Sequence, residues 1–227
     1  MINDRIIQLT EDGSHTIAIP AMNVTYHSRH GAIQESMHVF IQSGLRHLTN
    51  NKRVSRQDIH VFEAGFGTGL NALLSLQEAI QLDQKLSYHT IEPSPVAIED
   101  IRQLNYARIL DKNLNDYFYQ LHACEWNKEV AIHPSFSFKK INITLQQFET
   151  SKQFHIIYFD AFDPNAQPEL WTEIILKKMY ELLYPNGILV TYSSKGRVQR
   201  VMKASGFTIE KLKGPPGKRE IIRAEKN

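Results

Sequence analysis

Three glycines at alternate positions follow the first apolar run of the regular part of the chain. Gly65, Gly67 and Gly69 stand in the stretch EAGFGTGLN, residues 63–71. Glycines at this spacing let the backbone turn sharply and approach a ligand closely, and a helix starting near Gly69 would point its N-terminal amides at that ligand. The stretch is neither GxGxxG, because residue 70 is leucine, nor a P-loop, because no Lys-Ser/Thr follows. The pattern predicts a cradle for a nucleotide or a carboxylate.

Two carboxylates stand at the ends of later apolar runs. Glu92 follows YHTI, where a carboxylate can accept both ribose hydroxyls of an adenosine or can act only as a capping charge for the next helix. Asp160 follows FHIIYF and precedes Phe162, a pair that can hold an amine and stack on a planar ring, or that can form an ordinary Asp turn. A glycine cradle and a ribose carboxylate without a phosphate-binding lysine favour an adenosine ligand that is not a triphosphate. S-adenosylmethionine fits that description.

Alternating strands and helices must position these residues. From Asp58 onward, strand-like runs alternate with helical patterns, which is typical of βαβ units and a parallel sheet. The expected strands are 59–64, 86–92, 154–160 and 187–193, and the expected helices are 70–82, 95–110, 168–183 and 195–205. Ligands of such sheets lie beyond the carboxyl ends of the strands, so the cradle, Glu92 and Asp160 are expected to converge on one pocket.

The two ends of the chain depart from this alternation. Residues 5–20 read as a hairpin around Asp12-Gly13, followed by a helix over 32–45 that closes at Gly44. Near the other end, 206–214 and 219–226 are strand-like and too close together for a crossover helix, so they must pair antiparallel. Residues 113–150 show no clear pattern. We expect an accessory hairpin and helix at 1–50 and, at 51–227, an α/β domain whose sheet is mostly parallel.

Charge is balanced overall but unevenly distributed. The net charge is +2, yet residues 195–227 hold ten basic and three acidic side chains, or +7, against −5 in the preceding part. This asymmetry indicates either a polyanionic partner such as nucleic acid or a solvated basic face. A hydrophobic content of 42% is typical of a folded, soluble protein. A single cysteine, and no signal-peptide pattern or apolar run long enough to span a membrane, favour the cytoplasm and no membrane partner.

The remaining chemistry-bearing residues form no motif. His27 and His30 are the nearest approach to a metal-ligand pair, but the sequence supplies no third partner, so no metal is expected. Cys124 has no neighbouring motif and is expected to be buried and inert. Trp171 lies in a helical apolar row and is expected in the core.

Several segments together resemble the tRNA (5-methylaminomethyl-2-thiouridine) methyltransferase family, whose stand-alone MnmD-type members are similar to the methyltransferase half of the bifunctional enzyme MnmC. The resemblance extends back to the stretch from Tyr26 to Phe40 and so covers nearly the whole chain. GFGTGLN combined with DAF and PELW is specific, whereas the three glycines alone indicate only the wide methyltransferase superfamily. The segments are EAGFGTGLN at 63–71, YHTIEP at 88–93, YFDAFDPNAQPELW at 158–171, the strand after PNG at 185–187, and GPPGKRE at 214–220.

The resemblance implies a class I S-adenosylmethionine-dependent methyltransferase fold, which is Rossmann-like. It also implies methyl transfer to the amine of 5-aminomethyl-2-thiouridine at the tRNA wobble position. Asp160 would face that amine, and Glu92 would hold the cofactor's ribose. Many relatives carry Gly-Asp where this chain has Gln146-Gln147, which leaves the adenine contact unassigned. The methionine end of the cofactor would lie against Glu63, Gly65, Gly67, Gly69 and Asn71.

Contacts with the substrate are expected from aromatic and basic side chains. Phe162 would stack on the uridine or lie in the core, and Tyr26 would close over the cofactor or be structural. Asp160 would orient the amine, and whether it also accepts a proton stays open, because an anion favours the ammonium form. The tRNA phosphates would meet Lys195, Arg197, Lys218 and Arg219.

The bifunctional relatives continue into a flavin-dependent oxidase that makes the aminomethyl group. This chain ends at Asn227, so we expect no FAD oxidase domain and a separate enzyme that supplies the aminomethyl intermediate.

Two other functions stay open. A spermidine-synthase-like aminopropyltransferase would share the sheet and the acidic residues after the corresponding strand. Its diamine pocket, however, needs several carboxylates and no basic rim, and its glycine loop usually carries an Asp where this chain has Phe66 and Thr68. A non-catalytic RNA-binding module would retain the fold, but the intact cradle, Glu92 and Asp160 argue against that reading.

Overall fold

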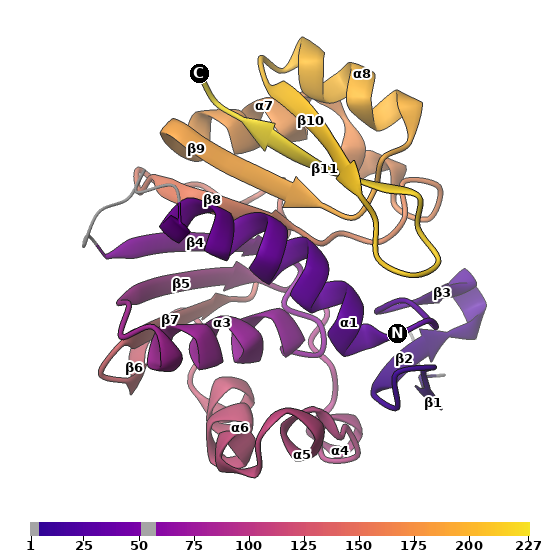
Figure 1. Cartoon of the computed structure of the whole chain (residues 1–227), viewed down its shortest axis with the longest axis vertical. Helices are drawn as coiled ribbons and strands as arrows, with labels where there is room; N and C mark the ends of the chain where they lie inside the picture. Colours follow the sequence, from indigo (N-terminus) through magenta and orange to yellow (C-terminus); the bar gives the residue numbers. More distant parts are fainter. Residues whose placement is uncertain (1–4, 51–57) are drawn as a thin grey trace.

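The computed structural model describes residues 5–50 and 58–227 and has a central eight-stranded sheet (Figure 1). The strands of this sheet are β4 (Ile59–Ala64), β5 (Leu86–Ile91), β6 (Glu129–His133), β7 (Phe136–Ile141), β8 (Phe154–Phe159), β9 (Leu183–Thr191), β10 (Thr208–Lys213) and β11 (Glu220–Glu225). Their order is β10-β11-β9-β8-β4-β5-β7-β6. In this order the neighbouring strands from β9 to β7 pair in parallel, namely β9 with β8, β8 with β4, β4 with β5 and β5 with β7. Strand β11 is antiparallel to both β9 and β10, and β6 is antiparallel to β7.

Helices cover both faces of this sheet. One face packs against the helix formed by α1, η2 and α2, together with α3 and α6, and the other packs against α7 and α8. Neighbouring residues on a strand therefore enter different cores, because side chains alternate between the faces. The helical elements are α1 (Ala32–Ser36), η2 (Met37–Leu45, π-helical), α2 (Arg46–Asn50), α3 (Leu70–Gln81), α4 (Ile98–Ile101), α5 (Tyr106–Leu110), η3 (Lys112–Leu114), α6 (Asn115–Ala123), η4 (Pro168–Trp171), α7 (Glu173–Leu182) and α8 (Gly196–Ala204).

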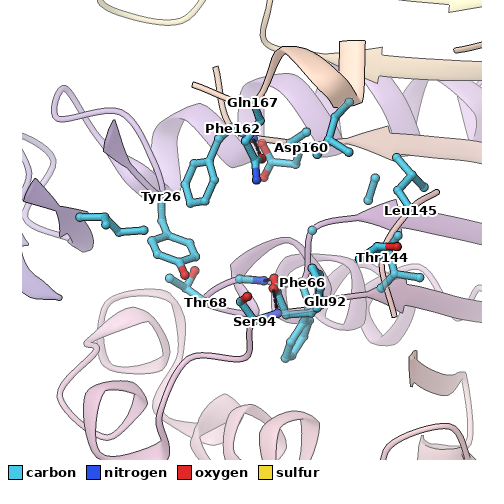
Figure 2. Close-up of a pocket in the computed structure, with 18 of the residues that line it drawn as sticks. Tyr26, Phe66, Thr68, Glu92, Ser94, Thr144, Leu145, Asp160, Phe162 and Gln167 are labelled. Atoms are coloured by element: carbon cyan, nitrogen blue, oxygen red, sulfur yellow. Dashed lines mark hydrogen bonds between the residues drawn. The ribbon is translucent and has the colours of Figure 1, made fainter. Parts of the chain in front are cut away.

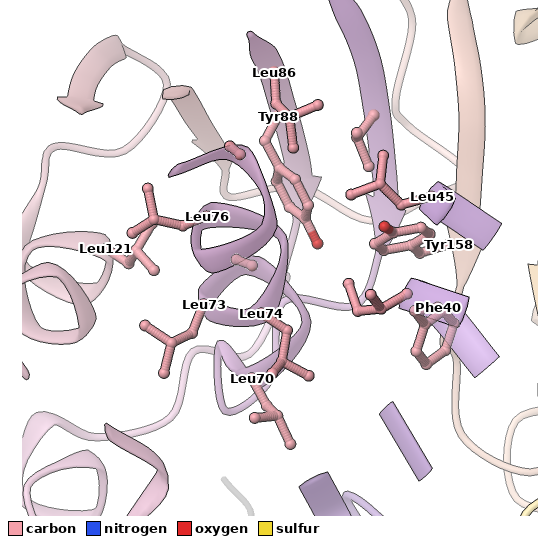
Figure 3. Close-up of a cluster of buried hydrophobic side chains, with 14 of the residues drawn as sticks. Phe40, Leu45, Leu70, Leu73, Leu74, Leu76, Leu86, Tyr88, Leu121 and Tyr158 are labelled. Atoms are coloured by element: carbon pink, nitrogen blue, oxygen red, sulfur yellow. The ribbon is translucent and has the colours of Figure 1, made fainter. Parts of the chain in front are cut away.

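Helix α3, which follows the glycine loop, is buried on most of its circumference (Figure 3). Leu73 and Leu76 face Leu121 of α6, while Leu74 lies on the side of Phe40. Burying a leucine side chain contributes about 1.5–3 kcal/mol. This packing fixes the loop that precedes α3 relative to the sheet.

A small antiparallel sheet lies beyond the carboxyl ends of the parallel strands (Figure 1). It contains β1 (Ile6–Leu9), β2 (His15–Ile19) and β3 (Val24–Thr25), with η1 (Pro20–Met22) between the last two. The hairpin expected around Asp12-Gly13 is confirmed, and Gly13 has the positive φ of 81° that this turn requires. The expected domain boundary after residue 50 falls at residues outside the described part of the chain.

The helix expected to close at Gly44 instead continues to Asn50. A Cβ at Gly44 would lie 2.8 Å from Ile156 Cδ1 and 3.2 Å from Val190 Cγ2. The glycine therefore permits close packing of the helix on the sheet and does not end the helix.

The single helix expected over 95–110 is wrong, because the chain breaks between α4 and α5. At the break, the Asn105 side chain accepts a hydrogen bond from His15 N and donates one to Gly13 O, both at 2.9 Å. The break thus anchors the N-terminal hairpin. The helix expected over 168–183 also begins later, at Glu173, with Thr172 as its N-cap.

Residues 113–150, in which the sequence shows no clear helix or strand pattern, contain α6, β6 and β7. Strand β7 pairs in parallel with β5 and is a parallel strand that the sequence analysis did not predict. The antiparallel pairing expected for the C-terminal hairpin is confirmed. No helix within 5–50 or 58–227 combines the length and apolar character needed to cross a bilayer.

Candidate active site

A cavity of about 280 Å³ lies beyond the carboxyl ends of β4, β5 and β8 (Figure 2). The loops after these strands, residues 144–146 and parts of the N-terminal sheet enclose it. The chain leaves β4 towards β5 on one side and later returns to β8 on the other, so the cavity lies where the strand order reverses. Open parallel sheets bind their ligands at this position.

The glycine loop forms one wall of the cavity. Gly65, Gly67 and Gly69 all have positive φ, at 101°, 49° and 74°. A Cβ would lie 3.1 Å from Asp160 O at Gly65 and 2.9 Å from the Tyr26 ring at Gly67. Gly65 and Gly67 line the cavity, whereas Gly69 lies outside its wall and begins α3. Only residues without a side chain fit this close approach.

Glu92 follows β5 and presents its carboxylate to the cavity (Figure 2). One oxygen accepts a hydrogen bond from Gly67 N at 3.0 Å and the other accepts one from Ser94 N at 2.8 Å. Burial raises the pKa of this carboxyl group, and the two amides oppose that rise. A carboxylate oxygen can accept two hydrogen bonds, so each oxygen retains capacity for a ligand hydroxyl.

Asp160 follows β8 and is held by Asn71 of α3. Asn71 Nδ2 donates to Asp160 Oδ2 at 2.8 Å. Burial, and then the nearby Glu35 carboxylate, raise the pKa of Asp160 to about 7, while the Asn71 hydrogen bond opposes the rise. Near neutral pH this carboxyl group therefore exists in both protonation states.

Two aromatic rings close the side of the cavity next to Asp160 (Figure 2). Tyr26 and Phe162 meet edge to face with ring centroids 5.1 Å apart. Burial raises the pKa of Tyr26 to about 12, so its hydroxyl group stays protonated. The guanidinium of Arg5 lies 5.9 Å from the Tyr26 ring and donates to the carbonyl groups of Ser94 and Pro95, which joins the N-terminal sheet to the loop after β5.

Glu63 does not line the cavity, although it belongs to the expected cofactor set. It is fully buried on the opposite face of β4 from Ala64, which does line the cavity. Burial raises the pKa of Glu63 to about 8. The sequence motif could not show this, since a shift of one residue along a strand reverses the face.

The four basic residues expected to meet tRNA all lie outside the cavity wall. Lys195 pairs with Asp163 at 2.7 Å, and Arg197 donates to Asn165 Oδ1 at 3.0 Å. The ammonium group of Lys218 pairs with buried Glu35 and lies 4.0 Å from the centroid of the Tyr192 ring. Arg219 is exposed.

Several residues of the cavity wall had no role in the site assigned to them from the sequence. His27 Nε2 is 2.7 Å from Thr68 Oγ1, and burial lowers the pKa of His27 to about 4, which keeps the ring neutral. His30 pairs instead with Glu11. Within the part of the chain that the structure describes, no cluster of three or more His, Cys, Asp or Glu side chains could hold a metal ion. Leu145 and Gln146 also line the cavity.

Trp171 supports the cavity wall, whereas Cys124 lies apart from it. Trp171 is in the core, as expected, and its Nε1 donates to Phe162 O at 2.9 Å, which fixes the backbone beside the aromatic pair. Cys124 is half-buried instead of buried, and burial raises the pKa of its thiol.

The model of a protein family described as "S-adenosyl-L-methionine-dependent methyltransferase" matches residues 105–227, more than half of the chain. The chain belongs to this family. The cofactor inferred from the glycine loop and Glu92 is therefore confirmed as S-adenosylmethionine, and the enzyme class as a methyltransferase.

Curated relatives of this methyltransferase are longer bifunctional proteins. It is 29% identical over 245 residues to the "tRNA 5-methylaminomethyl-2-thiouridine biosynthesis bifunctional protein MnmC" of Burkholderia mallei strain SAVP1. The protein of the same name from Burkholderia pseudomallei strain K96243 is 29% identical over 250 residues. Each match covers 99% of this chain and 36% of the relative. The chain thus spans about a third of the length of these relatives.

Solved structures share the fold of this methyltransferase. The crystal structure of MnmC2 from Aquifex aeolicus superposes with a TM-score of 0.80 at 23% identity, covering 99% of this chain and 70% of that one. Spermidine synthase from Thermotoga maritima gives a TM-score of 0.59 at 15% identity, covering 98% of this chain and 69% of that one. The class I, Rossmann-like fold expected from the sequence is confirmed.

Proposed function

We propose that this methyltransferase transfers a methyl group to the aminomethyl nitrogen of 5-aminomethyl-2-thiouridine at the wobble position of tRNA. The observation that carries the proposal is Asp160, a strand-end carboxylate that faces the cavity beside the Phe162 ring and is held by an amide instead of a cation. Such a group suits an amine carried on a planar base. The similarity of 99% of the chain to part of MnmC supports the same substrate.

The cavity residues fit S-adenosylmethionine. Glu92 would accept the ribose hydroxyls with its remaining lone pairs, and the backbone at Gly65 and Gly67 would approach the methionine end beside the N-terminus of α3. Leu145 and Gln146, which follow β7, would contact the adenine, and Tyr26 would cover the cofactor. The bound cofactor supplies a methyl group activated by a sulfonium centre.

Asp160 would orient the accepting amine. Methyl transfer needs a free nitrogen lone pair in line with the methyl group, and such alignment is worth up to about 7–11 kcal/mol. Asp160 would hold an N–H of the amine while Asn71 holds the carboxylate. Its pKa of about 7 also suits it to accept the proton that the nitrogen must lose.

The tRNA would dock across the mouth of the cavity. Phe162 would stack on the uridine, and Lys195, Arg197 and Arg219 would contact phosphates. The residues up to Asn50 would act as an accessory element that closes the cavity, because Arg5 and Tyr26 belong to its wall. A separate enzyme would supply the aminomethyl group in the cytoplasm, where the tRNA is.

An aminopropyltransferase activity fits the site less well, although the fold is shared with spermidine synthase. A diamine pocket needs several free carboxylates. Around Asp160, the Asp163 carboxylate is paired with Lys195 and the Glu35 carboxylate with Lys218. Asp160 therefore remains to hold one amine.

The test is incubation with S-adenosylmethionine and bulk tRNA from cells that lack the methyl modification, followed by nucleoside mass spectrometry. A gain of one methyl group on 5-aminomethyl-2-thiouridine is expected, and Asp160→Asn serves as the matched variant that abolishes most of it. A parallel reaction with decarboxylated cofactor and putrescine should give no product. Aminopropyl transfer without methylation would support the spermidine-synthase alternative, and tRNA binding without either reaction would support an RNA-binding module.

A further inference from the structure

A group of buried polar atoms without hydrogen-bond partners lies behind the cavity wall. No hydrogen bond of ordinary geometry reaches either carboxyl oxygen of Glu63 within the described structure, and the same holds for Asn71 Oδ1, the Tyr88 hydroxyl and the Thr90 hydroxyl. The Thr90, Asn71 and Tyr88 side chains nevertheless lie close enough to Glu63 to act on its carboxyl group. Glu63, Tyr88 and Thr90 are fully buried, and Asn71 is 3% exposed. Buried polar groups are paired in the great majority of cases, so this cluster requires a physical explanation.

The protonation state of Glu63 supplies that explanation. Burial raises the pKa of Glu63 to about 8; hydrogen bonding by the Thr90, Asn71 and Tyr88 side chains opposes this rise, and the charge of Asp160 adds to it. The other titratable groups that act on this site are Tyr88 and Tyr158, whose pKa values burial raises, so both stay neutral. In Figure 3 their hydroxyl groups face the same gap beside α3. At neutral pH Glu63 is therefore mainly a carboxylic acid with one O–H to donate.

When Glu63 is protonated, the hydrogen-bond donors of the cluster match its acceptors. The Asn71 amide nitrogen donates to Asp160, and its carbonyl oxygen can only accept. The protonated Glu63 carboxyl can donate to that oxygen, while the Tyr88 and Thr90 hydroxyls can donate to the remaining lone pairs of Glu63. An ionised Glu63 would leave Asn71 Oδ1 without this donor and would repel it.

We propose that Glu63 is a positioning residue whose protonated carboxyl group holds the Asn71 carbonyl oxygen, so that the Asn71 amide nitrogen faces Asp160. An asparagine side chain has two orientations of nearly the same shape, and the other one would direct its oxygen at the Asp160 carboxylate. Glu63 selects the orientation that holds Asp160 in place. The inference rests on the proposed function, in which Asp160 orients the accepting amine.

Two variants separate this role from that of an anionic cofactor ligand. Glu63→Leu removes the donor, and we expect kcat to fall about 10- to 100-fold through misplacement of Asp160. Glu63→Gln keeps an N–H donor without charge and should restore kcat to within about threefold of the natural protein. The Kd for S-adenosylmethionine, measured by calorimetry, should change less than about threefold in both.

A second readout needs no tRNA. The pKa of Asp160 can be followed by carbon NMR of protein labelled at the aspartate carboxyl carbons, with Asp160→Asn identifying the signal. It should rise in Glu63→Leu, because the Asn71 hydrogen bond that lowers it is lost, and stay unchanged in Glu63→Gln. Asn71→Ala should raise it as well, and adding Glu63→Gln should then have no further effect. Asn71→Ala also keeps the inference testable if Glu63→Leu does not fold.

Three results would overturn the inference: an Asp160 pKa that is the same in the natural protein and in Glu63→Leu, one that is unchanged in Asn71→Ala, or a Glu63→Gln variant that loses cofactor affinity as Glu63→Leu does. The last would make Glu63 an anionic ligand of the cofactor. Failure of the proposed function looks different, because tRNA would stay unmethylated while the NMR shifts of Asp160 remained as expected.

Discussion

The ammonium group of Lys218 pairs with the buried carboxylate of Glu35, although 183 positions separate the two residues in the sequence. The second Glu35 oxygen accepts a hydrogen bond from Ser28 N at 2.7 Å. Beneath Lys218, the Tyr192 hydroxyl donates to Ala161 O at 2.9 Å, in the loop that follows Asp160. The ion pair thus connects the C-terminal hairpin with the N-terminal segment, and the contact of Lys218 with Tyr192 extends this connection to the loop of the candidate active site.

Lys218→Ala is expected to lower the free energy of unfolding by about 2 kcal/mol, because it leaves the buried Glu35 carboxylate without a cation. Urea unfolding measures this loss. Arg219→Ala, at the exposed neighbouring position, is the matched control and should change stability by less than about 0.5 kcal/mol.

Adding Glu35→Gln to Lys218→Ala should recover part of the lost stability, since no unpaired charge then remains. If Lys218→Ala instead weakens tRNA binding while stability is unchanged, Lys218 is a phosphate contact and the structural role is wrong.

Methyl transfer should depend on the ionisation of Asp160. Its pKa of about 7 predicts that kcat rises with pH across this value, as the carboxylate becomes available to hold the amine. Asp160→Asn should lower kcat by about 100-fold or more while changing the Kd for S-adenosylmethionine little.

The measurement is a pH profile of single-turnover methylation for both proteins. Ionisation of the substrate amine also contributes to the natural profile, so the informative quantity is the limb that disappears in Asp160→Asn. Turnover by Asp160→Asn at the natural rate would eliminate the assignment.

Glu92→Ala should weaken S-adenosylmethionine binding by about 10- to 100-fold, because it removes the acceptor for the ribose hydroxyls and for the amides of Gly67 and Ser94. Calorimetry with the cofactor measures this change. Glu99→Ala removes a carboxylate from the exposed surface of the following helix and should leave the affinity unaltered. Equal affinities for the two variants would exclude Glu92 from the cofactor site.

His27 should make stability dependent on pH. Burial lowers its pKa from 6.5 to about 4, although the nearby Glu35 carboxylate opposes this shift, so below pH 6.5 the unfolded chain binds a proton that the folded one does not. Comparison with His27→Gln isolates the contribution of His27 to the free energy of unfolding. Relative to that variant, the natural protein should lose up to about 3 kcal/mol of unfolding free energy between pH 6.5 and pH 4, and no further change should occur above pH 7.

Chemical or thermal unfolding at several pH values provides the comparison. A difference between the two proteins that stays constant from pH 7 to pH 4 would mean that His27 becomes protonated in the folded state as readily as in the unfolded state.

The parts of the fold that follow strong local patterns could be predicted from the sequence. Periodicity and loop length leave few possible topologies for three features of the sequence. The alternation from Ile59 onward predicts a parallel sheet, the Asp12-Gly13 turn predicts a hairpin, and the short connection at 215–218 predicts an antiparallel pair of strands. Strand β7 was missed because its buried positions include Lys140, whose ammonium group donates to His122 O. A buried lysine with a partner elsewhere in the fold has no local signature.

The site was predictable where function is carried by the residue directly after a strand. Gly65, Glu92 and Asp160 line the cavity for this reason. The face on which Glu63 lies and the partner of Lys218 depend on tertiary packing. Residues such as Arg5 and Leu145 reach the wall from segments whose position only the folded chain determines.

Strand β11 lies between β9 and β10 in the sheet although it follows both in the sequence. During synthesis, the ribosome must therefore release residues 220–225 before β10 gains its neighbour and before the outer edge of β9 is covered. Until then the nascent chain carries an unpaired strand edge of the kind that promotes aggregation. The Lys218–Glu35 contact also waits for this step, so the active site can be completed only after the residues up to Glu225 have left the ribosome.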